Sequence, residues 1–289
     1  MDARITGRTR ALALIGSPVA HSGSPAMYNY CFEKLGFDCV YVAFDVTPEK
    51  LGDAMRGIKA LNFSGINITM PCKAAVIEYM DELSPAVKLM GACNTAVNVN
   101  GRWTGHNTDG VGYVESLRAE GVDVSGKSLT ILGAGGAGTA IAVQSALSGA
   151  KRITIFNRKS ETYVRAERTA ESIRSQISGC TVSVRELADE RALIESVSES
   201  DILANATRAG MAPDTDIMPI SSAALFRKGL VVTEAIYNPL ETKLLCEAKA
   251  AGCVAINGIG MLIYQGAAAF KLYTGADMPV DEVKARFFS

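Results

Sequence analysis

Short apolar runs alternate along the whole chain with longer stretches in which apolar and polar residues are mixed. The short runs predict buried strands, and the longer stretches predict helices. In the first third of the chain we expect strands at 11–15, 39–46, 65–68 and 93–99, with helices between them at 25–35, 48–60 and 71–80. This alternation is typical of an α/β domain.

The same alternation continues in the rest of the chain. A helix is expected at 108–120, followed by strands at 128–132, 152–156, 181–184, 202–205, 230–233 and 253–256. Strands separated by helices in this way predict a doubly wound parallel sheet. Two helices, over 257–273 and 279–288, should end the chain and pack back on the first domain.

A glycine-rich motif, Gly133-Ala-Gly-Gly-Ala-Gly138, follows the strand expected at 128–132 and precedes an apolar, helix-like run. The spacing G-x-G-x-x-G occurs by chance in many sequences, so its place between a strand and a helix matters most. Gly133 would allow the tight turn, Gly135 would let the backbone approach a pyrophosphate, and Gly138 would let the helix pack closely on the strand. The helix N-terminus would then face the anion. A flexible glycine loop is the alternative interpretation.

This context predicts a Rossmann-type dinucleotide-binding domain at residues 108–258. Residues 1–107 and 259–289 would form an α/β domain that binds the substrate and carries the catalytic groups. A chain of 289 residues exceeds the usual size of a single domain, which agrees with a division in two.

The charge of the chain is nearly balanced, with 29 basic and 30 acidic residues and a net charge of -1. Such a chain exerts no broad attraction on nucleic acid or an anionic membrane, so a small-molecule substrate is expected. Two uncharged stretches, 128–150 and 250–270, are long enough to span a bilayer, but both contain glycines and polar side chains. With no leader-like segment after Met1, we expect a cytoplasmic protein without membrane or nucleic-acid partners.

The seven cysteines form no C-x-x-C pair, and the chain has only two histidines, His21 and His106. This pattern predicts neither a metal site nor a disulfide framework. Scattered cysteines are usually small buried hydrophobes, although Cys72 and Cys93 stand beside candidate functional residues. No motif places a base beside either thiol, so a catalytic cysteine is not expected.

Lys73 ends the polar motif Asn67-Ile-Thr-Met-Pro-Cys-Lys73. Pro71 suits the first turn of a helix and Met70 before it favours an extended backbone, so Lys73 should fall in that first turn. The helix dipole and desolvation would both push the amine toward its neutral form, which makes Lys73 a candidate proton acceptor. The alternative, which residue type alone favours, is a solvated lysine whose alkyl chain covers apolar surface.

Asp109, in Asn107-Thr-Asp-Gly110, is the candidate partner of Lys73. Taken singly, it also fits a helix N-cap or an acid in the first helical turn. If the two groups are close they titrate as a unit, and the sequence leaves open which one holds the proton. Asn94, in Gly91-Ala-Cys-Asn-Thr95, can hydrogen-bond a substrate hydroxyl or be an ordinary turn asparagine.

Two serines lie in the segment Gly16-Ser-Pro-Val-Ala-His-Ser-Gly-Ser-Pro25. Ser24, directly before a proline, is expected to cap a helix. Ser22 is freer to meet a ligand, and both serines are candidate binding residues.

Six segments resemble, in order along the chain, the successive signatures of the shikimate dehydrogenases: 16–25, 67–73, 91–95, 107–110, 133–138 and 258–265. The resemblance covers essentially the full length, and six ordered motifs make a chance match implausible. It is closest to the quinate/shikimate dehydrogenase branch, through Phe156-Asn-Arg158, Thr233-Glu-Ala-Ile-Tyr-Asn-Pro239 and Tyr273-Thr-Gly-Ala-Asp-Met-Pro279.

The resemblance implies that Lys73 and Asp109 are a catalytic pair that takes the proton of a ring hydroxyl while hydride passes to a nicotinamide cofactor. Shikimate, quinate or both would be converted reversibly to the 3-dehydro ketone. Polar side chains would bind the hydroxyls and carboxylate of this cyclohexane or cyclohexene acid: Ser22, Ser24, Thr69, Asn94 and Gln265, with Tyr41 lining the same site. Cofactor contacts are implied for Ala134, Gly135, Gly136 and Ala137 at the pyrophosphate, Asn157, Arg158, Lys159 and Ser160 at the adenosine ribose, Arg208 in a neighbouring stretch, and Tyr237 and Gly258 at the nicotinamide.

The choice between NAD and NADP depends on the residues after the second strand of this domain. An acid at this place would bind the ribose 2′-hydroxyl and favour NAD, but the chain has Asn157, Arg158, Lys159 and Ser160. Cationic neighbours suit a 2′-phosphate, so we expect NADP to be favoured and NAD also to be used. Members of the resembled branch that use NAD well tend to have an aspartate in place of Ser160, and Glu161 next to it could partly replace that acid.

Two other interpretations stay open. A folate-linked methylene dehydrogenase has a similar two-domain plan, but the tyrosine that it places four residues before its lysine is Thr69 here. The second is a nucleotide-binding regulator without turnover; Lys73, Asp109 and the lack of an appended DNA-binding segment argue against it. The sequence leaves open the preference for shikimate or quinate, the physiological direction, and the choice between monomer and homodimer.

Overall fold

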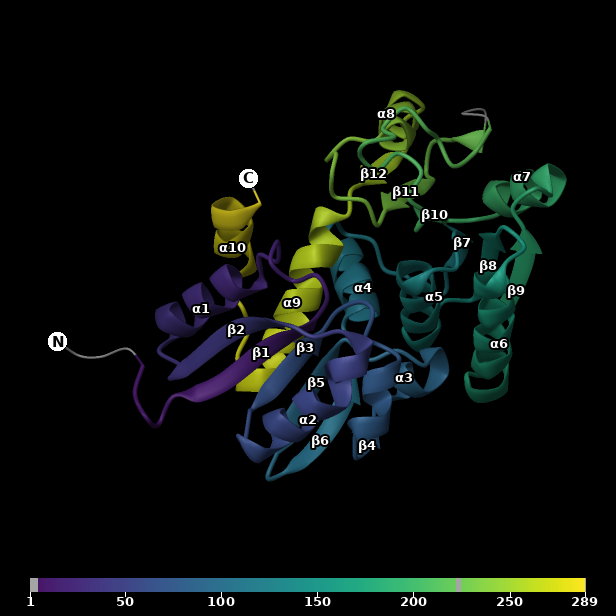
Figure 1. Cartoon of the computed structure of the whole chain (residues 1–289). Helices are drawn as coiled ribbons and strands as arrows, with labels where there is room; N and C mark the ends of the chain where they lie inside the picture. Colours follow the sequence, from purple (N-terminus) through teal and green to yellow (C-terminus); the bar gives the residue numbers. More distant parts are fainter. Residues whose placement is uncertain (1–4, 222–224, 289) are drawn as a thin grey trace. The chain divides into compact units, whose positions relative to one another are not determined.

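The computed structural model describes residues 5–221 and 225–288 (Figure 1). The chain divides into two units. The first contains the residues up to Thr108 together with those from Gln265 onward, and the second runs from Asp109 to Tyr264. The later division falls inside helix α9 (Ile259–Thr274), beyond the limit expected after residue 258.

The first unit is built on a mixed sheet with the strand order β2-β1-β3-β5-β6-β4. β1 pairs in parallel with β2 and β3, whereas β5 is antiparallel to both β3 and β6. The strands are β1 (Arg10–Gly16), β2 (Cys39–Asp45), β3 (Gly65–Ile68), β4 (Glu82–Leu83), β5 (Thr95–Val99) and β6 (Arg102–His106). The helices before β6 are α1 (Ser24–Leu35), η1 (Pro48–Lys50), α2 (Leu51–Ala60), η2 (Ala75–Tyr79) and α3 (Pro85–Met90).

In this unit one strand was missed and one expected helix was wrong. The strand expected at 93–99 is the first arm of a hairpin, β5 to β6, and its second arm was missed because its sequence is mostly polar. Asn100 and Gly101 turn the chain with positive φ angles of 53° and 85°, and Asn-Gly between two strands is the strongest short signal for a hairpin. The helix expected at 71–80 is only the short 3₁₀ helix η2, preceded by consecutive turns.

The last helices lie against the first unit's α1 and β3 (Figure 1). On α9, Phe270 stacks with Phe32 of α1, with ring centroids 5.4 Å apart. A Cβ atom at Gly65 of β3 would lie 2.6 Å from the ring of Tyr273, so only glycine permits this close approach. Glu282 of α10 (Val280–Phe287) pairs with Lys34 at 2.6 Å. These contacts join the end of the chain to its beginning.

The second unit contains an all-parallel sheet with the order β12-β11-β10-β7-β8-β9. From β7 the chain moves outward to β8 and β9, then returns to the other side of β7 and continues to β12, which confirms the doubly wound sheet. The strands are β7 (Ser128–Leu132), β8 (Arg152–Asn157), β9 (Thr181–Glu186), β10 (Ile202–Asn205), β11 (Val231–Glu234) and β12 (Val254–Ile256). The helices are α4 (Asp109–Ala119), α5 (Gly136–Leu147), α6 (Glu161–Gln176), α7 (Glu190–Ser198) and α8 (Lys243–Ala250), followed by α9.

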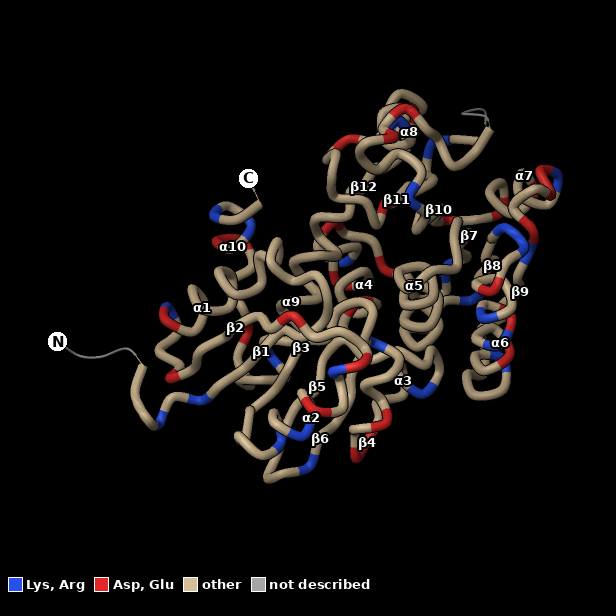
Figure 2. Tube along the Cα trace, in the orientation of Figure 1, with Lys and Arg blue, Asp and Glu red and all other residues tan. Residues whose placement is uncertain are grey.

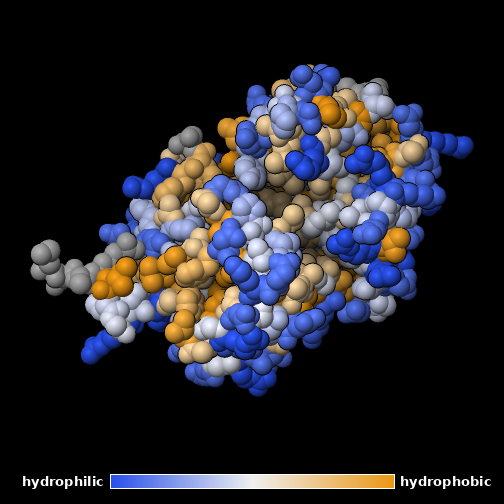
Figure 3. Space-filling model, viewed as in Figure 1, coloured by the Kyte–Doolittle hydropathy of each residue, from blue (hydrophilic) through white to orange (hydrophobic). Residues whose placement is uncertain are grey.

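Acidic and basic residues are interspersed along the trace, most visibly on α6 (Figure 2). Apolar surface gathers over β2, an edge strand with exposed Val42 and Phe44 (Figure 3). Within the described part of the chain, no helix combines the length and the apolar character needed to cross a bilayer.

Candidate active site

Four polar segments lie at one edge of the first unit's sheet: 16–25, 67–73, 91–95 and the residues that lead from β6 to Thr108. β1 and β3 end at this edge, the antiparallel β5 begins there, and β6 ends there. The segments that follow or precede these strand ends are therefore neighbours, although they are far apart in the sequence. Backbone hydrogen bonds join them: Ser17 N–H to Met70 O (3.0 Å), Cys93 N–H to Lys73 O (2.8 Å), and Asn94 N–H to His106 O (3.1 Å).

Lys73 lies in the turns before η2, not in the first turn of an α-helix as expected. The turns begin with a bond from Cys72 N–H to Thr69 O (3.0 Å), and the carbonyl of Lys73 accepts the N–H of Cys93, just before β5. The reason is that this segment bends to meet the start of β5 before any helix begins. The side chain of Lys73 is half-buried, and the backbone that carries it is held by hydrogen bonds at Cys72 N–H and Lys73 O.

A buried polar network runs beneath this edge. The hydroxyl of Tyr41 donates to Asn67 Oδ1 at 2.8 Å, and Asn67 Nδ2 donates to Thr95 Oγ1 at 3.0 Å. Thr95 in turn donates to Asn94 Oδ1 at 3.0 Å, and Asn94 Nδ2 donates to Thr108 Oγ1 at 3.0 Å. All five residues are at most 7% exposed. Buried polar groups keep their places when each is hydrogen-bonded, so this network gives the edge a fixed geometry.

The network reaches the residue before Asp109. Asn94 Oδ1 accepts the backbone N–H of Thr108 at 2.8 Å. Asp109 then begins α4 and is the acidic residue of its first turn, as one of the two sequence interpretations expected. A carboxylate at this end of a helix is favoured by the helix dipole. Tyr41, with 1% exposure and its hydroxyl donating to Asn67, supports this edge from below.

The serines depart from the expectation. α1 begins at Ser24 after Gly23, and no side chain caps it. Instead Ser22 Oγ accepts the N–H of Ser24 at 3.3 Å, because that first N–H has no partner within the helix. Ser22 is thus the residue that satisfies the helix start, and Ser24 is its first residue. Both are partly exposed, as are Thr69 and, on α9, Gln265.

In the second unit the glycine-rich turn has the geometry that its sequence predicts. Gly133 has a φ of +94°, and a Cβ on Gly138 would lie 2.0 Å from Gly133 O, so both positions require glycine. Gly135 and Gly136 have no heavy atom within 4 Å of an added Cβ and are exposed at the start of α5. The open backbone at this helix N-terminus fits a pyrophosphate. Ala134 is buried, and its N–H donates to Asn157 Oδ1 at 3.2 Å.

The segment after β8 is organised by that same asparagine. Asn157 Nδ2 donates to Thr162 Oγ1 at 2.9 Å, and Thr162 contacts Ser160 Oγ at 2.8 Å. Arg158 is exposed, whereas Lys159 pairs with Glu186 at 2.6 Å. Of the two cations expected near the ribose, one is therefore already engaged by a carboxylate.

The remaining cofactor candidates follow the ends of β10, β11 and β12, at the same edge. Arg208 is exposed, and Tyr237 is 47% exposed. Gly258 is buried, its N–H donates to Ile236 O at 2.9 Å, and an added Cβ would lie 2.6 Å from Ala235 O. Close packing therefore explains the glycine at 258.

The cysteines behave as small buried residues at five of their seven positions. Burial raises the pKa of Cys93 to about 11, and hydrogen bonds and the charge of Lys73 oppose this only in part. Burial also raises the pKa of Cys72 and lowers the pKa of His106. Both thiols thus stay protonated near neutral pH. The described residues contain no group of three or more His, Cys, Asp or Glu side chains that could hold a metal ion.

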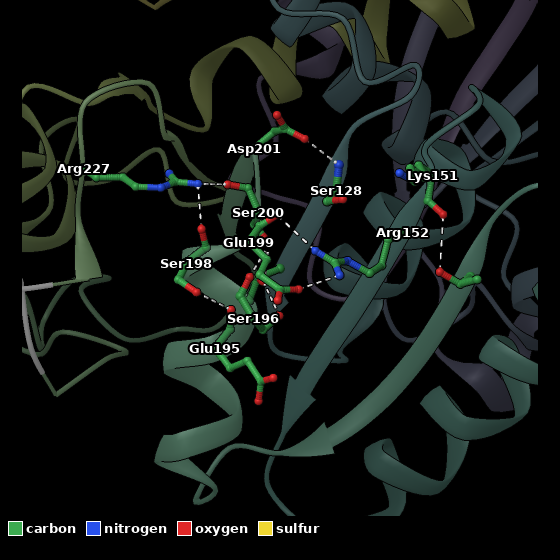
Figure 4. Close-up of polar contacts among 12 residues, drawn as sticks. Ser128, Lys151, Arg152, Glu195, Ser196, Ser198, Glu199, Ser200, Asp201 and Arg227 are labelled. Atoms are coloured by element: carbon green, nitrogen blue, oxygen red, sulfur yellow. Dashed lines mark hydrogen bonds and ion pairs between the residues drawn. The ribbon is translucent and has the colours of Figure 1, made fainter.

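A hollow of about 500 Å³ lies at the opposite, amino edge of the second sheet. Among its lining residues, Arg152 Nη1 pairs with Glu199 at 2.7 Å, and the backbone N–H of Ser128 donates to Asp201 beside the hollow at 2.9 Å (Figure 4). Parallel sheets bind ligands at their carboxyl edge. The glycine-rich edge is therefore the better candidate site.

The parallel doubly wound sheet and its glycine-rich turn define a Rossmann-type protein. Residues 14–96 match the model of the shikimate dehydrogenase substrate binding domain, and residues 258–286 match that of the shikimate 5'-dehydrogenase C-terminal domain. A shikimate dehydrogenase (NADP⁺) of Streptococcus uberis is 49% identical over 100% of this chain and 99% of its own. A quinate/shikimate dehydrogenase of Escherichia coli is 43% identical, with 97% of each chain covered.

Among solved structures, shikimate 5-dehydrogenase from Listeria monocytogenes in complex with shikimate and NAD has a TM-score of 0.97. It is 45% identical and covers 100% of this chain and 99% of its own. The chain belongs to the shikimate dehydrogenase family. This assignment replaces the folate-linked alternative.

Proposed function

We propose that this protein catalyses the reversible oxidation of shikimate to its 3-dehydro ketone with NADP⁺ or NAD⁺. The observation that supports this most is the convergence of four polar motifs, including that of Lys73, at one edge of the first sheet. Relatives named shikimate dehydrogenase (NADP⁺), and a related structure that holds shikimate and NAD, support the substrate and the cofactor class. A second substrate, quinate, is favoured by the quinate/shikimate dehydrogenase relative.

In this proposal the first unit binds the substrate. Ser22, Ser24, Thr69 and Gln265 are partly exposed polar groups that suit the hydroxyls and carboxylate of a cyclohexene acid. Asn94 contributes by fixing the edge on which they stand, because its amide is bonded to Thr95 and Thr108.

Lys73 and Asp109 are the proposed proton-transfer pair. As the ring carbinol is oxidised, its hydroxyl proton passes to the pair, and in the reverse direction the pair returns it to the ketone oxygen. A positioned acid or base of this kind contributes roughly 10²- to 10⁴-fold to the rate. The bound nicotinamide supplies the acceptor for the hydride.

The second unit is proposed to hold the dinucleotide at the carboxyl edge of its sheet. Gly135, Gly136 and Ala137 would bind the pyrophosphate with backbone N–H groups, while Asn157 keeps the turn in shape through Ala134. Arg208, Tyr237 and Gly258 follow neighbouring strands and would contact the rest of the cofactor.

NADP is the proposed preferred cofactor. Arg158 is exposed beside the expected ribose position, and Ser160 stands where an acid would select NAD. A guanidinium suits a 2′-phosphate because it can form two parallel hydrogen bonds to it. The pairing of Lys159 with Glu186 weakens that selection and agrees with some use of NAD.

A steady-state matrix of shikimate and quinate against NADP⁺ and NAD⁺ tests the proposal. The highest kcat/KM is expected for shikimate with NADP⁺. No cofactor reduction with either acid, despite ligand binding, would instead support the non-catalytic regulator. A large preference for NAD⁺ would overturn the cofactor assignment alone. A cytoplasmic location and a monomeric or homodimeric state stay predictions from the sequence.

A further inference from the structure

Glu234 ends β11 and is 2% exposed, and the reaction proposed above does not use it. Burying a carboxyl group costs free energy unless hydrogen bonds or opposite charges compensate. Both oxygens have a donor: Thr242 Oγ1 donates to Oε1 at 2.8 Å, and Asn205 Nδ2 donates to Oε2 at 2.9 Å. Burial raises the pKa of Glu234 to about 7, and these two hydrogen bonds oppose the rise. Glu234 therefore lowers the stability of the fold when it is ionised, which suggests a functional role.

The carboxylate orients Asn205, its register partner on the neighbouring strand β10. Because Glu234 Oε2 accepts a hydrogen bond from Asn205 Nδ2, the amide nitrogen of Asn205 faces Glu234. Its oxygen then faces the other way and accepts the N–H of Thr207 at 2.9 Å and the hydroxyl of Thr207 at 2.7 Å. The same Nδ2 also donates to Ala209 O at 3.3 Å. One buried acid thus sets the path of the segment that leads to Arg208.

This segment packs tightly against the glycine-rich turn. A Cβ on Gly133 would lie 2.9 Å from Thr207 Cγ2 and 3.0 Å from Ala206 O. A Cβ on Gly138 would lie 3.4 Å from Ala206 Cβ. The segment therefore lies so close to Gly133 that this position has no room for a side chain. If residues 206–207 shift, the turn or Arg208 has to shift with them.

The other oxygen of Glu234 is connected to the chain beyond β11. Thr242 is 1% exposed and caps α8 by accepting the N–H of Leu245 at 3.3 Å. Next to Glu234, Ala235 N–H donates to Asn205 O at 2.9 Å, so the start of the segment that leads to Tyr237 is held too. The Glu234 carboxyl group thus links Asn205, from which the segment to Arg208 leads, to Thr242 at the start of α8.

We propose that Glu234 is a positioning residue for dinucleotide binding, which through Asn205 fixes residues 206–209 against the glycine-rich turn and through Thr242 fixes the chain after β11. This inference rests on the proposed function, because it takes the carboxyl edge of the second sheet as the cofactor site. Glu234 acts at a distance, through its two partners, and touches neither substrate nor cofactor.

The test compares Glu234→Gln with Ser200→Ala in the full-length protein. Glutamine keeps the shape of the side chain but presents an N–H group to one of the two donors. Ser200 is also 2% exposed and bonds Thr130 Oγ1 at 2.7 Å, but it precedes β10 at the amino edge of the same sheet (Figure 4). Ser200→Ala thus removes a buried hydrogen bond of similar kind away from the proposed cofactor site.

The dissociation constant of NADPH is measured by fluorescence titration, which requires no turnover, and Tm is recorded for each protein. Ser200→Ala should lose stability, but only Glu234→Gln should raise the Kd for NADPH, by about 3- to 10-fold. Its KM for shikimate should stay near the wild-type value. Thr242→Val removes the donor to Oε1 and leaves Asn205 in place, and it should raise the same Kd. This variant tests the proposal if Glu234→Gln does not fold.

An unchanged Kd for NADPH in Glu234→Gln, or an equal rise in Ser200→Ala, would overturn the proposal. Wild-type protein that binds neither NADPH nor NADH would overturn both this inference and the proposed function. Wild-type protein that binds NADPH but oxidises neither acid would overturn only the proposed function, and the comparison of Kd values would still decide the role of Glu234.

Discussion

The two units use the edges of their sheets in different ways. In the first, a mixed sheet brings four separate motifs together, and the candidate groups are side chains such as Lys73 and Ser22. In the second, an all-parallel sheet presents open backbone at Gly135 and Gly136, and side chains such as Asn157 and Glu234 hold that backbone in place. Substrate selection should therefore respond to changes of functional groups, whereas cofactor binding should respond to changes of backbone packing.

The largest effect is expected for Asp109→Asn. The asparagine amide has nearly the same shape as the carboxyl group, but it can neither accept nor release a proton near neutral pH. The kcat should therefore fall roughly 10²- to 10⁴-fold. The loss of an acid from the first turn of α4 should cost stability only a few tenths of a kcal/mol. Steady-state kcat together with Tm checks this, and a variant with wild-type kcat would remove Asp109 from the catalytic pair.

The glycine-rich turn allows a matched pair of variants, Gly138→Ala and Gly135→Ala. At Gly138 the added methyl group would meet Gly133 O at 2.0 Å, so unfolding free energy should fall by about 3 kcal/mol or more. At Gly135 the methyl group meets nothing within 4 Å, so stability should hardly change, while the KM for NADP⁺ should rise. Denaturant unfolding and cofactor KM are measured for both.

The opposite pattern, with Gly135→Ala unstable or binding NADP⁺ as the wild type does, would contradict the proposed pyrophosphate contact.

The raised pKa of Glu234 predicts that the stability of the protein depends on pH. Between its ordinary pKa and about 7, the unfolded carboxyl is ionised while the folded one is still protonated. The unfolded state then binds fewer protons, so stability falls as the pH rises through this window and is level above it. The fall should be on the order of 3 kcal/mol, and Glu234→Gln should lack it.

Denaturant midpoints of both proteins from pH 5 to pH 8 check this difference. Parallel curves for the wild type and Glu234→Gln would show that the buried carboxyl does not titrate in this range.

The smallest effect concerns Glu186→Gln, which releases Lys159. The pair is exposed and therefore weak, so the ratio of kcat/KM for NADP⁺ over NAD⁺ should rise only about 2- to 5-fold. Because salt screens exposed charges, the rise should diminish at high ionic strength. Glu199→Gln, which releases Arg152 at the opposite edge, is the control. An equal change in both variants would deny Lys159 a role in selecting the cofactor.

The sequence predicted the second unit better than the first, for a physical reason. Most of its strands contain a short apolar run, and the turn at 133–138 requires glycine for local steric causes that can be read directly. In the first unit, β6 and the turns around Lys73 depend on pairing with distant strands. The Asn100-Gly101 signal could have revealed the hairpin.

Hydrogen bonds between residues far apart in the chain could not be predicted from the sequence. Nothing in the local pattern pairs Asn67 with Thr95, or Glu234 with Asn205, because their meeting depends on strand register. The same limit applies to Ser22, whose bond to Ser24 N–H follows from where α1 begins. The sequence motifs identified the candidate residues, whereas the strand register determines which of these side chains hydrogen-bond to one another.

The role proposed for Lys73 in proton transfer is tested by the turnover of Lys73→Ala with shikimate and NADP⁺. We predict that kcat falls roughly 10²- to 10⁴-fold. The dissociation constants for shikimate and NADPH, measured on the same protein, should change only a few-fold. Wild-type turnover by the purified variant would exclude Lys73 from proton transfer.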